Sequence, residues 1–559
     1  SYDDGILQPY FTVIAKGSNP DRKEEFVSVI RQVLGDIVKN GIDKKAVEAG
    51  INYFEFRYRE ADFSSYPKGL MYSLDILGDW LYEKGNPFAQ VQQLTVFEKL
   101  KKAVNEGYFE ELIRKYLLEN PHGCIMTLVP KKGLAAQREK ELEEKLEAYR
   151  SSLSEEQLDA MVEKTKALEA YQEAGEDPKA LECIPMLKRS DIKREAAKII
   201  NEELTVDDSL FLYHDVCTNG IGYVDLMFKT DSIAPEQIPY LGLLKSVLGY
   251  VDTENYTYGE LFNEINANTG GINCGVEVFD RADSTEEFQA MFSVRGKALY
   301  TKMDFLFKMI GEILNSSKLE DTKRLYEIVA SVKSRAQVNL TGAGHSTAVL
   351  RAAAYSSPMA AFQDEMAGIG YYQFIEKLEK DFEQRKEETL EELCKLMKKI
   401  LRPENFMISY TGERESLETV QKLAGAVKAG LGTEPVEKSE EKLTCTKKNE
   451  GFKTSGQVQY VAQTGNFKKK GLEYTGALEI LKVILSYDYL WQNVRVKGGA
   501  YGCMSSFNRI GEGYLVSYRD PNLEKTMEIY EGVVDYLKNF NVDDRDMNKF
   551  IIGTISNID

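Results

Sequence analysis

The sequence lacks the short motifs by which most classes of enzyme are recognised. It contains no G-x-S-x-G nucleophile motif, no Walker loop, no G-x-G-x-x-G dinucleotide loop and neither zinc motif, H-E-x-x-H or H-x-x-E-H. Histidine is also scarce, because only His122, His214 and His345 occur among 559 residues, and they lie far apart. We therefore expect no metal ligands in this chain and no self-sufficient catalytic apparatus.

Two of these histidines have structural interpretations that need no metal. His345 lies in Thr-Gly-Ala-Gly-His-Ser346, where a helix is expected to begin, so capping or packing competes there with a catalytic role. His214 lies in an apolar stretch, and we expect it to be a hydrogen-bonded residue of a strand in the core or at an edge.

Seven cysteines are present, but no two of them form a C-x-x-C pair. They are scattered along the chain, at positions 124, 183, 217, 274, 394, 445 and 503. An odd, scattered set predicts neither a disulfide framework nor a structural zinc site. Reduced thiols are typical of the cytosol, so we expect a cytoplasmic location, with the natural N-terminus not seen. No window is long and apolar enough to predict a membrane span.

Positive charge is in deficit, since 71 lysines and arginines face 89 aspartates and glutamates, a formal net charge of −18. This balance argues against a nucleic-acid backbone or an anionic membrane as partner. A hydrophobic content of 43% with 11% aromatics is typical of a globular protein. The length predicts about three or four packed units.

The most informative stretch is a sharp corner between a helix and a strand. Apolar residues at helical spacing over 478–491 predict a helix that ends near Arg495. The pair Gly498-Gly499 breaks that helix, because glycine permits backbone angles that other residues resist. Residues 500–507 then read as a strand, so Arg495 and Tyr501 flank the corner.

Arg495 and Tyr501 can be interpreted in two ways. A guanidinium and a phenol hydroxyl are both hydrogen-bond donors, and the corner could direct them at one carbonyl oxygen. In the other interpretation, Arg495 merely faces solvent and Tyr501 packs in a core. The residues by themselves leave both interpretations open.

Elsewhere the pattern alternates between helices and strands. In the first part of the chain we predict strands at 10–16 and 124–129 and a helix that begins at Asp21. Residues 131–180 are dense in Glu, Lys, Gln and Ala and contain a capping-box pattern at Ser154-Glu-Glu-Gln157. This stretch predicts two charged helices that form a hairpin linker with solvated faces.

A fuller unit follows from about Cys183. We predict a helix after Pro235, and the expected strands of this unit are 210–216 paired with 222–229, then 272–280, 286–296 and 405–411. A last helix near 414–428 and a polar linker follow, and the final unit opens with a strand at 457–463.

The order helix, Gly-Gly, strand, strand, helix occurs twice and indicates an internal repeat. Gly270-Gly271 corresponds to Gly498-Gly499, and Phe292-Ser-Val-Arg295 corresponds to Val-Ser-Tyr-Arg519. The opening segment matches only the back half of a unit, with Phe11 aligned to Phe292. We therefore expect the chain to be a piece of a longer protein in which the first and last copies are incomplete.

Two motifs near the C-terminus resemble the fourth domain of the presequence protease family. They are Arg495-Val-Lys-Gly-Gly-Ala-Tyr-Gly502 and Ser517-Tyr-Arg-Asp-Pro-Asn522, supported by Ile184-Pro-Met-Leu-Lys-Arg-Ser-Asp-Ile192 and by Gly344-His345 with Arg351. That family belongs to the pitrilysin and insulinase group of zinc metallopeptidases. The resemblance implies an α+β fold of repeated two-layer α/β sandwich domains of the pitrilysin and mitochondrial-processing-peptidase (LuxS/MPP-like metallohydrolase) type, joined by a helical hairpin.

With this resemblance the chain divides into five parts. They are the back part of the second peptidase-like domain (1–134), the helical hairpin linker (135–183), a complete third domain (184–432), a linker (433–450) and a truncated fourth domain (451–559).

The resemblance also implies a function for the whole protein. Members of the family hold a zinc ion through the two histidines of H-x-x-E-H and a distal glutamate, all in the first domain and so outside this chain. Arg495 and Tyr501 match the pair that binds the substrate carbonyl and stabilises the oxyanion. The implied partners are unfolded peptides, degraded in an enclosed chamber, and the N-terminal half of the same protein. This chain alone would be inactive.

A second hypothesis is a non-catalytic scaffold or partner subunit, since members of this fold can lose the catalytic motif. An intact H-x-x-E-H upstream of Ser1 would favour the enzyme, and its loss would favour the scaffold. The presence of both Arg495 and Tyr501 favours the enzyme, because a scaffold does not need paired oxyanion donors.

Overall fold

The chain folds as α+β units built from helices and mixed sheets. The computed structural model describes residues 1–81, 85–174, 177–181, 183–196, 198–439, 441–454 and 456–556. They form two compact units, one of residues 1–42 and 105–191 and one of residues 43–104 and 192–559. No helix in these described ranges is long and apolar enough to cross a membrane.

The first unit is mainly helical. α1 (Lys23–Asn40) contacts α5 (Tyr108–Ile113) and the π-helical turn Arg114–Leu118, and β1 (Tyr2–Asp3) pairs with β2 (Tyr10–Phe11). The helix after Asp21 is confirmed, but the strand predictions at 10–16 and 124–129 are wrong beyond Tyr10–Phe11. In 124–129, Met126 and Leu128 are mostly exposed and, within the described residues, no strand lies beside them to complete a ladder.

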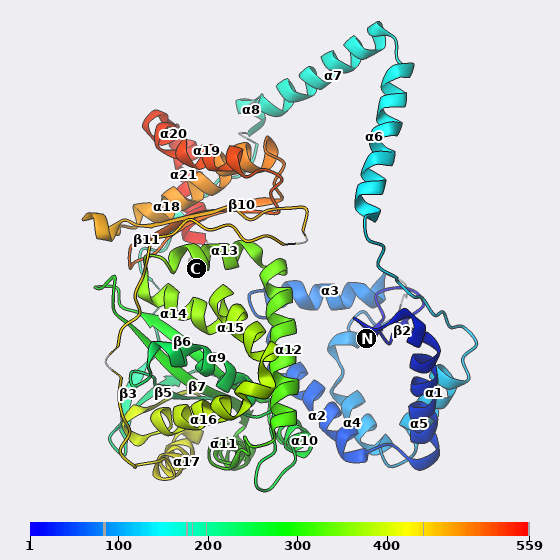
Figure 1. Ribbon diagram of the computed structural model, residues 1–559, viewed down its shortest axis with the longest axis vertical. Coiled ribbons are helices and arrows are strands. Elements are labelled where there is room, and N and C mark those ends of the chain that lie inside the picture. The colour runs from blue at the N-terminus through cyan, green and yellow to red at the C-terminus, as the bar shows by residue number, and fades with distance from the viewer. Residues whose placement is uncertain are drawn as a thin grey trace. The chain divides into compact units, whose positions relative to one another are not determined.

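The predicted charged hairpin is confirmed as α6 (Leu134–Ser152) and α7 (Glu155–Glu173), two long helices joined by a short turn (Figure 1). The Ser154 hydroxyl accepts from the Gln157 backbone N–H, and the Gln157 side chain accepts from the Ser154 N–H, which completes the capping box. α6 buries none of its residues, so its charges are solvated as expected.

The second unit begins with three helices, α2 (Lys44–Glu60), α3 (Lys68–Trp80) and α4 (Leu94–Ala103). Its larger sheet has six strands in the order β3-β4-β8-β5-β7-β6, and all neighbours are antiparallel except β4 and β8. The strands are β3 (Glu202–Val206), β4 (Ser209–Asp215), β5 (Ile221–Lys229), β6 (Ile272–Asp280), β7 (Phe288–Leu299) and β8 (Phe406–Gly412).

The predicted strands of this sheet are confirmed, but the direct pairing of 210–216 with 222–229 is wrong. β8 lies between β4 and β5 and pairs with both. It inserts Ile408 and Tyr410, both fully buried, and the Tyr410 ring stacks on Tyr213 at 6.1 Å. This apolar insertion comes from a distant part of the chain, so the local hairpin pattern could not indicate it.

Helices cover one face of the six-stranded sheet, as Figure 1 shows for α9 (Ile238–Val247). On β5, Val224, Leu226 and Phe228 join this core, whereas Tyr223 and Asp225 lie on the other face, as the two-residue period of a strand requires. The other helices of this part are α10 (Tyr258–Asn268), α11 (Met303–Ser316), α12 (Thr322–Gly342), α13 (Gly344–Ala353), α14 (Pro358–Ala367), α15 (Ile369–Lys380), α16 (Phe382–Ile400) and α17 (Leu417–Ala429).

The last part of the chain forms a three-stranded antiparallel sheet in the order β10-β11-β9. β9 (Ala462–Asn466) lies later than the predicted strand at 457–463, whereas β10 (Gly502–Phe507) and β11 (Glu512–Tyr518) lie where the sequence placed strands. Its helices are α18 (Ala477–Ile484), α19 (Glu524–Glu531), α20 (Val533–Asn539) and α21 (Asp544–Ser556). The order and antiparallel pairing match those of β6-β7-β5 in the larger sheet.

Candidate carbonyl-binding site at a glycine corner

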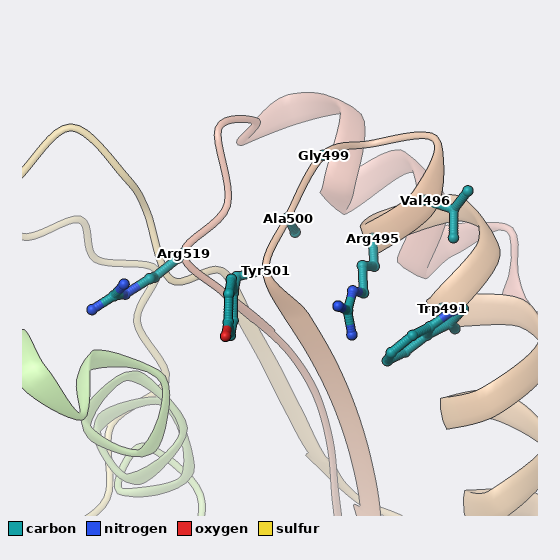
Figure 2. A pocket seen from close by; sticks show the side chains of 7 residues that line it. All are labelled: Trp491, Arg495, Val496, Gly499, Ala500, Tyr501 and Arg519. Atoms are coloured by element: carbon teal, nitrogen blue, oxygen red, sulfur yellow. The ribbon is translucent and has the colours of Figure 1, made fainter. Parts of the chain in front are cut away.

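A cavity of about 580 Å³ opens at the predicted corner between helix and strand. Its walls are the end of the helix, the glycine turn, the residue before β10 and the residue after β11 (Figure 2). The lining residues are Trp491, Arg495, Val496, Gly499, Ala500, Tyr501 and Arg519.

The helix that leads to the corner changes its winding. It begins as α18 and continues as two π-helical turns, Leu485–Tyr489 and Trp491–Val496, with the Lys497 N–H donating to the Gln492 carbonyl at 3.0 Å. Leu485 and Leu490 are five residues apart and both buried, a spacing that suits a π turn. The sequence predicted the helix but not its wider winding, which is common at functional sites.

The turn itself depends on both glycines. A Cβ on Gly498 would collide with the carbonyl oxygen of Val494, and Gly499 adopts a φ of +80°, which favours glycine. The Gly499 N–H donates to the Arg495 carbonyl at 2.9 Å, which closes the helix end. The predicted break in the helix is therefore confirmed.

Two residues after β11 fasten the turn. The Asn522 side-chain amide donates to the Gly498 carbonyl at 2.6 Å. Asp520, which is fully buried, accepts from the Asn522 backbone N–H at 2.8 Å and from the Thr526 hydroxyl at 2.7 Å. Sequence reasoning noted the Asp-Pro-Asn stretch but assigned it no role, although such a stretch commonly forms a side-chain-stabilised turn.

Arg495 and Tyr501 both border the cavity. The Arg495 guanidinium carbon lies 3.9 Å from the centre of the Trp491 ring and 5.8 Å from that of Tyr501. Figure 2 shows both side chains extending from the corner in the same direction. In the described part of the chain neither side chain has a hydrogen-bond or ion-pair partner, and Tyr501 is 65% exposed, so it does not pack in a core.

The Tyr501 ring is supported from behind by other rings. It meets Tyr518 edge-on at 5.8 Å, and Tyr518 in turn meets His345 edge-on at 4.9 Å. His345 therefore packs rather than caps its helix, and its Nδ1 is buried without a partner among the described residues. His214 is hydrogen-bonded as expected, through Nδ1 to the Ile200 carbonyl and through Nε2 to the Ser409 hydroxyl.

The one thiol near the corner is held protonated. Burial raises the pKa of the Cys503 thiol to about 11, and the nearby Arg495 guanidinium opposes this only in part. A neutral buried thiol is a poor nucleophile. All seven cysteines lie in the described part of the chain, and none of them forms a disulfide.

The described residues do not offer a metal site. Nowhere in the described ranges do three His, Cys, Asp or Glu side chains come together in a way that could hold an ion. The zinc ligand set implied by the family resemblance therefore does not fit the described part of this chain.

The earlier glycine pair forms a similar corner that is closed. Alignment of the two glycine pairs places Ala267 and Asn273 at the positions of Arg495 and Tyr501. The Ala267 carbonyl accepts from the Asn52 side chain of α2 at 3.2 Å, and a Cβ on Gly270 would collide with the Phe56 ring. At this corner α2 occupies the space that is open in front of Arg495 and Tyr501.

Relatives match the chain over its whole length, and two family models match parts of it. A model for the region associated with peptidases of family M16, subfamily C, matches residues 128–378, and one described as "PreP C-terminal domain" matches residues 449–559. The "Protein HypA" of Clostridium perfringens is 39% identical over 100% of this chain and 57% of its own length. "Presequence protease 1, chloroplastic/mitochondrial" of Arabidopsis thaliana is 30% identical over 100% of this chain and 52% of its own length.

Among solved structures, a "peptidase M16 inactive domain from Pseudomonas fluorescens" matches 64% of this chain and 87% of its own, with 15% identity and a TM-score of 0.39. The chain spans about half the length of the curated relatives it matches.

Proposed function

Because the chain belongs to the presequence protease family and corresponds to the C-terminal half of its members, we propose that it forms the substrate-binding side of a zinc-dependent metalloendopeptidase. Arg495 and Tyr501, two donors without partners that border one cavity, support this proposal most directly. They would bind the carbonyl oxygen of the peptide bond that is cleaved.

The two side chains suit this task chemically. A carbonyl oxygen gains negative charge as the tetrahedral intermediate forms, and an N–H and an O–H donor aimed at it stabilise that charge. Arg495 is held by the ring of Trp491 and by the hydrogen-bonded glycine turn, so little reorganisation is needed. A preorganised donor of this kind lowers the barrier by about 2.7–4 kcal/mol.

Zinc belongs to this proposal only for the full-length protein. The family implies ligands from an H-x-x-E-H motif and a distal glutamate, and this chain lacks that motif. We propose that those ligands reside in the N-terminal half and that the chain is inactive alone. The free thiols are consistent with a cytoplasmic setting, which is also part of the proposal.

The finer fold assignment is likewise proposed. The matched order of β6-β7-β5 and β10-β11-β9, with a helix and a glycine pair before β6 and before β10, supports repeated α/β sandwich domains with the boundaries given above. Two such halves would enclose a chamber that admits unfolded peptides, in keeping with the name of the Arabidopsis relative.

The test uses the full-length protein and an unstructured peptide substrate. Arg495→Ala and Tyr501→Phe should each lower kcat by about 10²- to 10³-fold with bound zinc unchanged, because each removes one donor. Arg509→Ala and Tyr514→Phe, in the same β10–β11 hairpin but outside the cavity, serve as matched controls. Unchanged turnover in the first two variants would refute the role of this corner. A full-length protein that binds no zinc and cleaves no peptide would favour the scaffold hypothesis instead.

A further inference from the structure

Arg519, the second arginine of the cavity, has an unusual backbone. Its φ is +49°, in the left-handed region that few residues other than glycine adopt. The ladder between β11 and β9 holds regularly up to the hydrogen bond from the Ser517 N–H to the Val461 carbonyl, and it resumes at Asp520 with Gln459. Tyr518 and Arg519 thus lie opposite the single residue Tyr460, which is a β-bulge.

The bulge redirects the Arg519 side chain. The Tyr501 N–H donates to both carbonyls of the bulge, that of Tyr518 at 3.0 Å and that of Arg519 at 3.3 Å. Bulges commonly occur next to active sites, where they change the direction of a side chain. Here the bulge brings Arg519 to the wall of the same cavity as Arg495 (Figure 2).

The corresponding arginine of the larger sheet provides an internal comparison. The alignment of 292–295 with 516–519 and the strand register both place Arg295 at the position of Arg519. β7 is regular at Arg295, which pairs with Asp225 at 2.8 Å and with Glu277 at 3.1 Å. In the described residues Arg519 has no acidic partner, so the redirected arginine is the one whose charge is unpaired.

The cavity around Arg519 is cationic in an otherwise acidic chain. Two arginines line it and no aspartate or glutamate does, although the whole chain has a formal net charge of −18. A guanidinium binds a carboxylate through two parallel hydrogen bonds, and carboxylates are the anionic groups that unmodified peptides carry.

We infer that Arg519 is a specificity-determining residue that binds a carboxylate of the peptide substrate. The inference rests on the proposed function, since it takes the peptide to be held at Arg495 and Tyr501. Figure 2 shows Arg519 and Arg495 on opposite sides of Tyr501, so the carboxylate belongs to a residue other than the one whose carbonyl is bound. Its source is either an acidic side chain or the C-terminal carboxylate of the peptide.

The experiment compares matched peptides with the full-length protein. In one series a single Glu, or a Gln in its place, is moved stepwise along an otherwise neutral peptide, and in a second pair the C-terminus is a free acid or an amide. At one position the peptide with the carboxylate should have a kcat/KM about tenfold higher than its neutral partner. The series in which this ratio appears identifies the source of the carboxylate.

The variants test whether Arg519 is responsible. Arg519→Gln should bring the ratio close to one, Arg519→Glu should invert it, and Arg519→Lys should keep most of it. Arg519→Gly tolerates the positive φ and removes only the side chain, so it should behave like Arg519→Gln. Arg509→Glu, a charge reversal outside the cavity, should leave the ratio unchanged.

The failure of this inference can be told apart from that of the proposed function. If the proposed function holds, Arg495→Ala lowers the cleavage of both peptides of a pair by the same factor. A ratio that stays the same in Arg519→Gln and Arg519→Glu, or that is close to one in both series with the unmodified protein, would overturn the role of Arg519 and leave that of Arg495 intact.

Discussion

The Arg495 guanidinium lies 3.9 Å from the centre of the Trp491 ring, four residues earlier in the same helical segment. The flat ring fixes the plane of the guanidinium and leaves its N–H groups free to face the cavity. Trp491 is thus a positioning residue that acts through Arg495.

Replacing Trp491 should weaken catalysis without removing the donor. We expect Trp491→Ala to lower kcat by about 2- to 30-fold, which corresponds to the range of a cation–π interaction, with a smaller change in KM. Trp491→Phe retains an aromatic face and should restore most of the loss. Steady-state kinetics of the full-length variants measure this, and an equal loss in both variants would argue against stacking as the cause.

The two glycines should differ in their sensitivity to substitution. Gly499→Ala places a side chain at a φ of +80° and should destabilise the protein by about 1 kcal/mol. Gly498→Ala should cost more, because its Cβ would meet the Val494 and Asn493 carbonyls and displace the turn. Gly465→Ala, in β9 with open space around it, is the control for thermal unfolding and for turnover.

The contacts of Asp520 and Asn522 should hold the corner in place. Asn522→Ala removes the donor to the Gly498 carbonyl and is expected to lower turnover with a modest loss of stability, about 1 kcal/mol. Asp520→Ala leaves the buried Thr526 hydroxyl and the Asn522 N–H unpaired and should cost about 1–3 kcal/mol. Denaturant unfolding and kinetics together separate the two effects, and full turnover in Asn522→Ala would contradict the first.

The Cys503 thiol should remain protonated across the physiological range. Its pKa rises from 9.0 to about 11 because it is buried, so the folded state retains the proton where the unfolded state releases it. The stabilisation is therefore complete below about pH 9 and is lost as the pH rises toward 11. At pH 8 an alkylating reagent should modify the exposed Cys217 long before Cys503, which mass spectrometry of peptides can follow. Equal rates at the two cysteines would contradict the assignment.

The sequence predicted those parts of the fold that are determined locally. The corner was accessible because a helical period, a glycine pair and an apolar strand follow one another directly over 478–507. The hairpin of α6 and α7 was accessible for the same reason, since its capping box and its charges are local signals.

The parts that the sequence did not predict depend on distant partners. The place of β8 between β4 and β5 is decided by tertiary packing, and β9 lies later than expected because the Arg519 bulge interrupts its pairing with β11. The contact of Asn522 with Gly498 joins two loops across the ends of β10 and β11. Periodicity within one segment carries no information about such contacts.

The Phe56 ring of α2, seated against Gly270, bears on the number of peptides that one molecule can hold. The same supersecondary arrangement is present twice in the second unit, yet an aromatic plug fills the earlier copy while the later one faces an open cavity. Duplication of the architecture therefore does not double the binding capacity. A titration with a non-cleavable peptide should reach saturation at one equivalent per polypeptide.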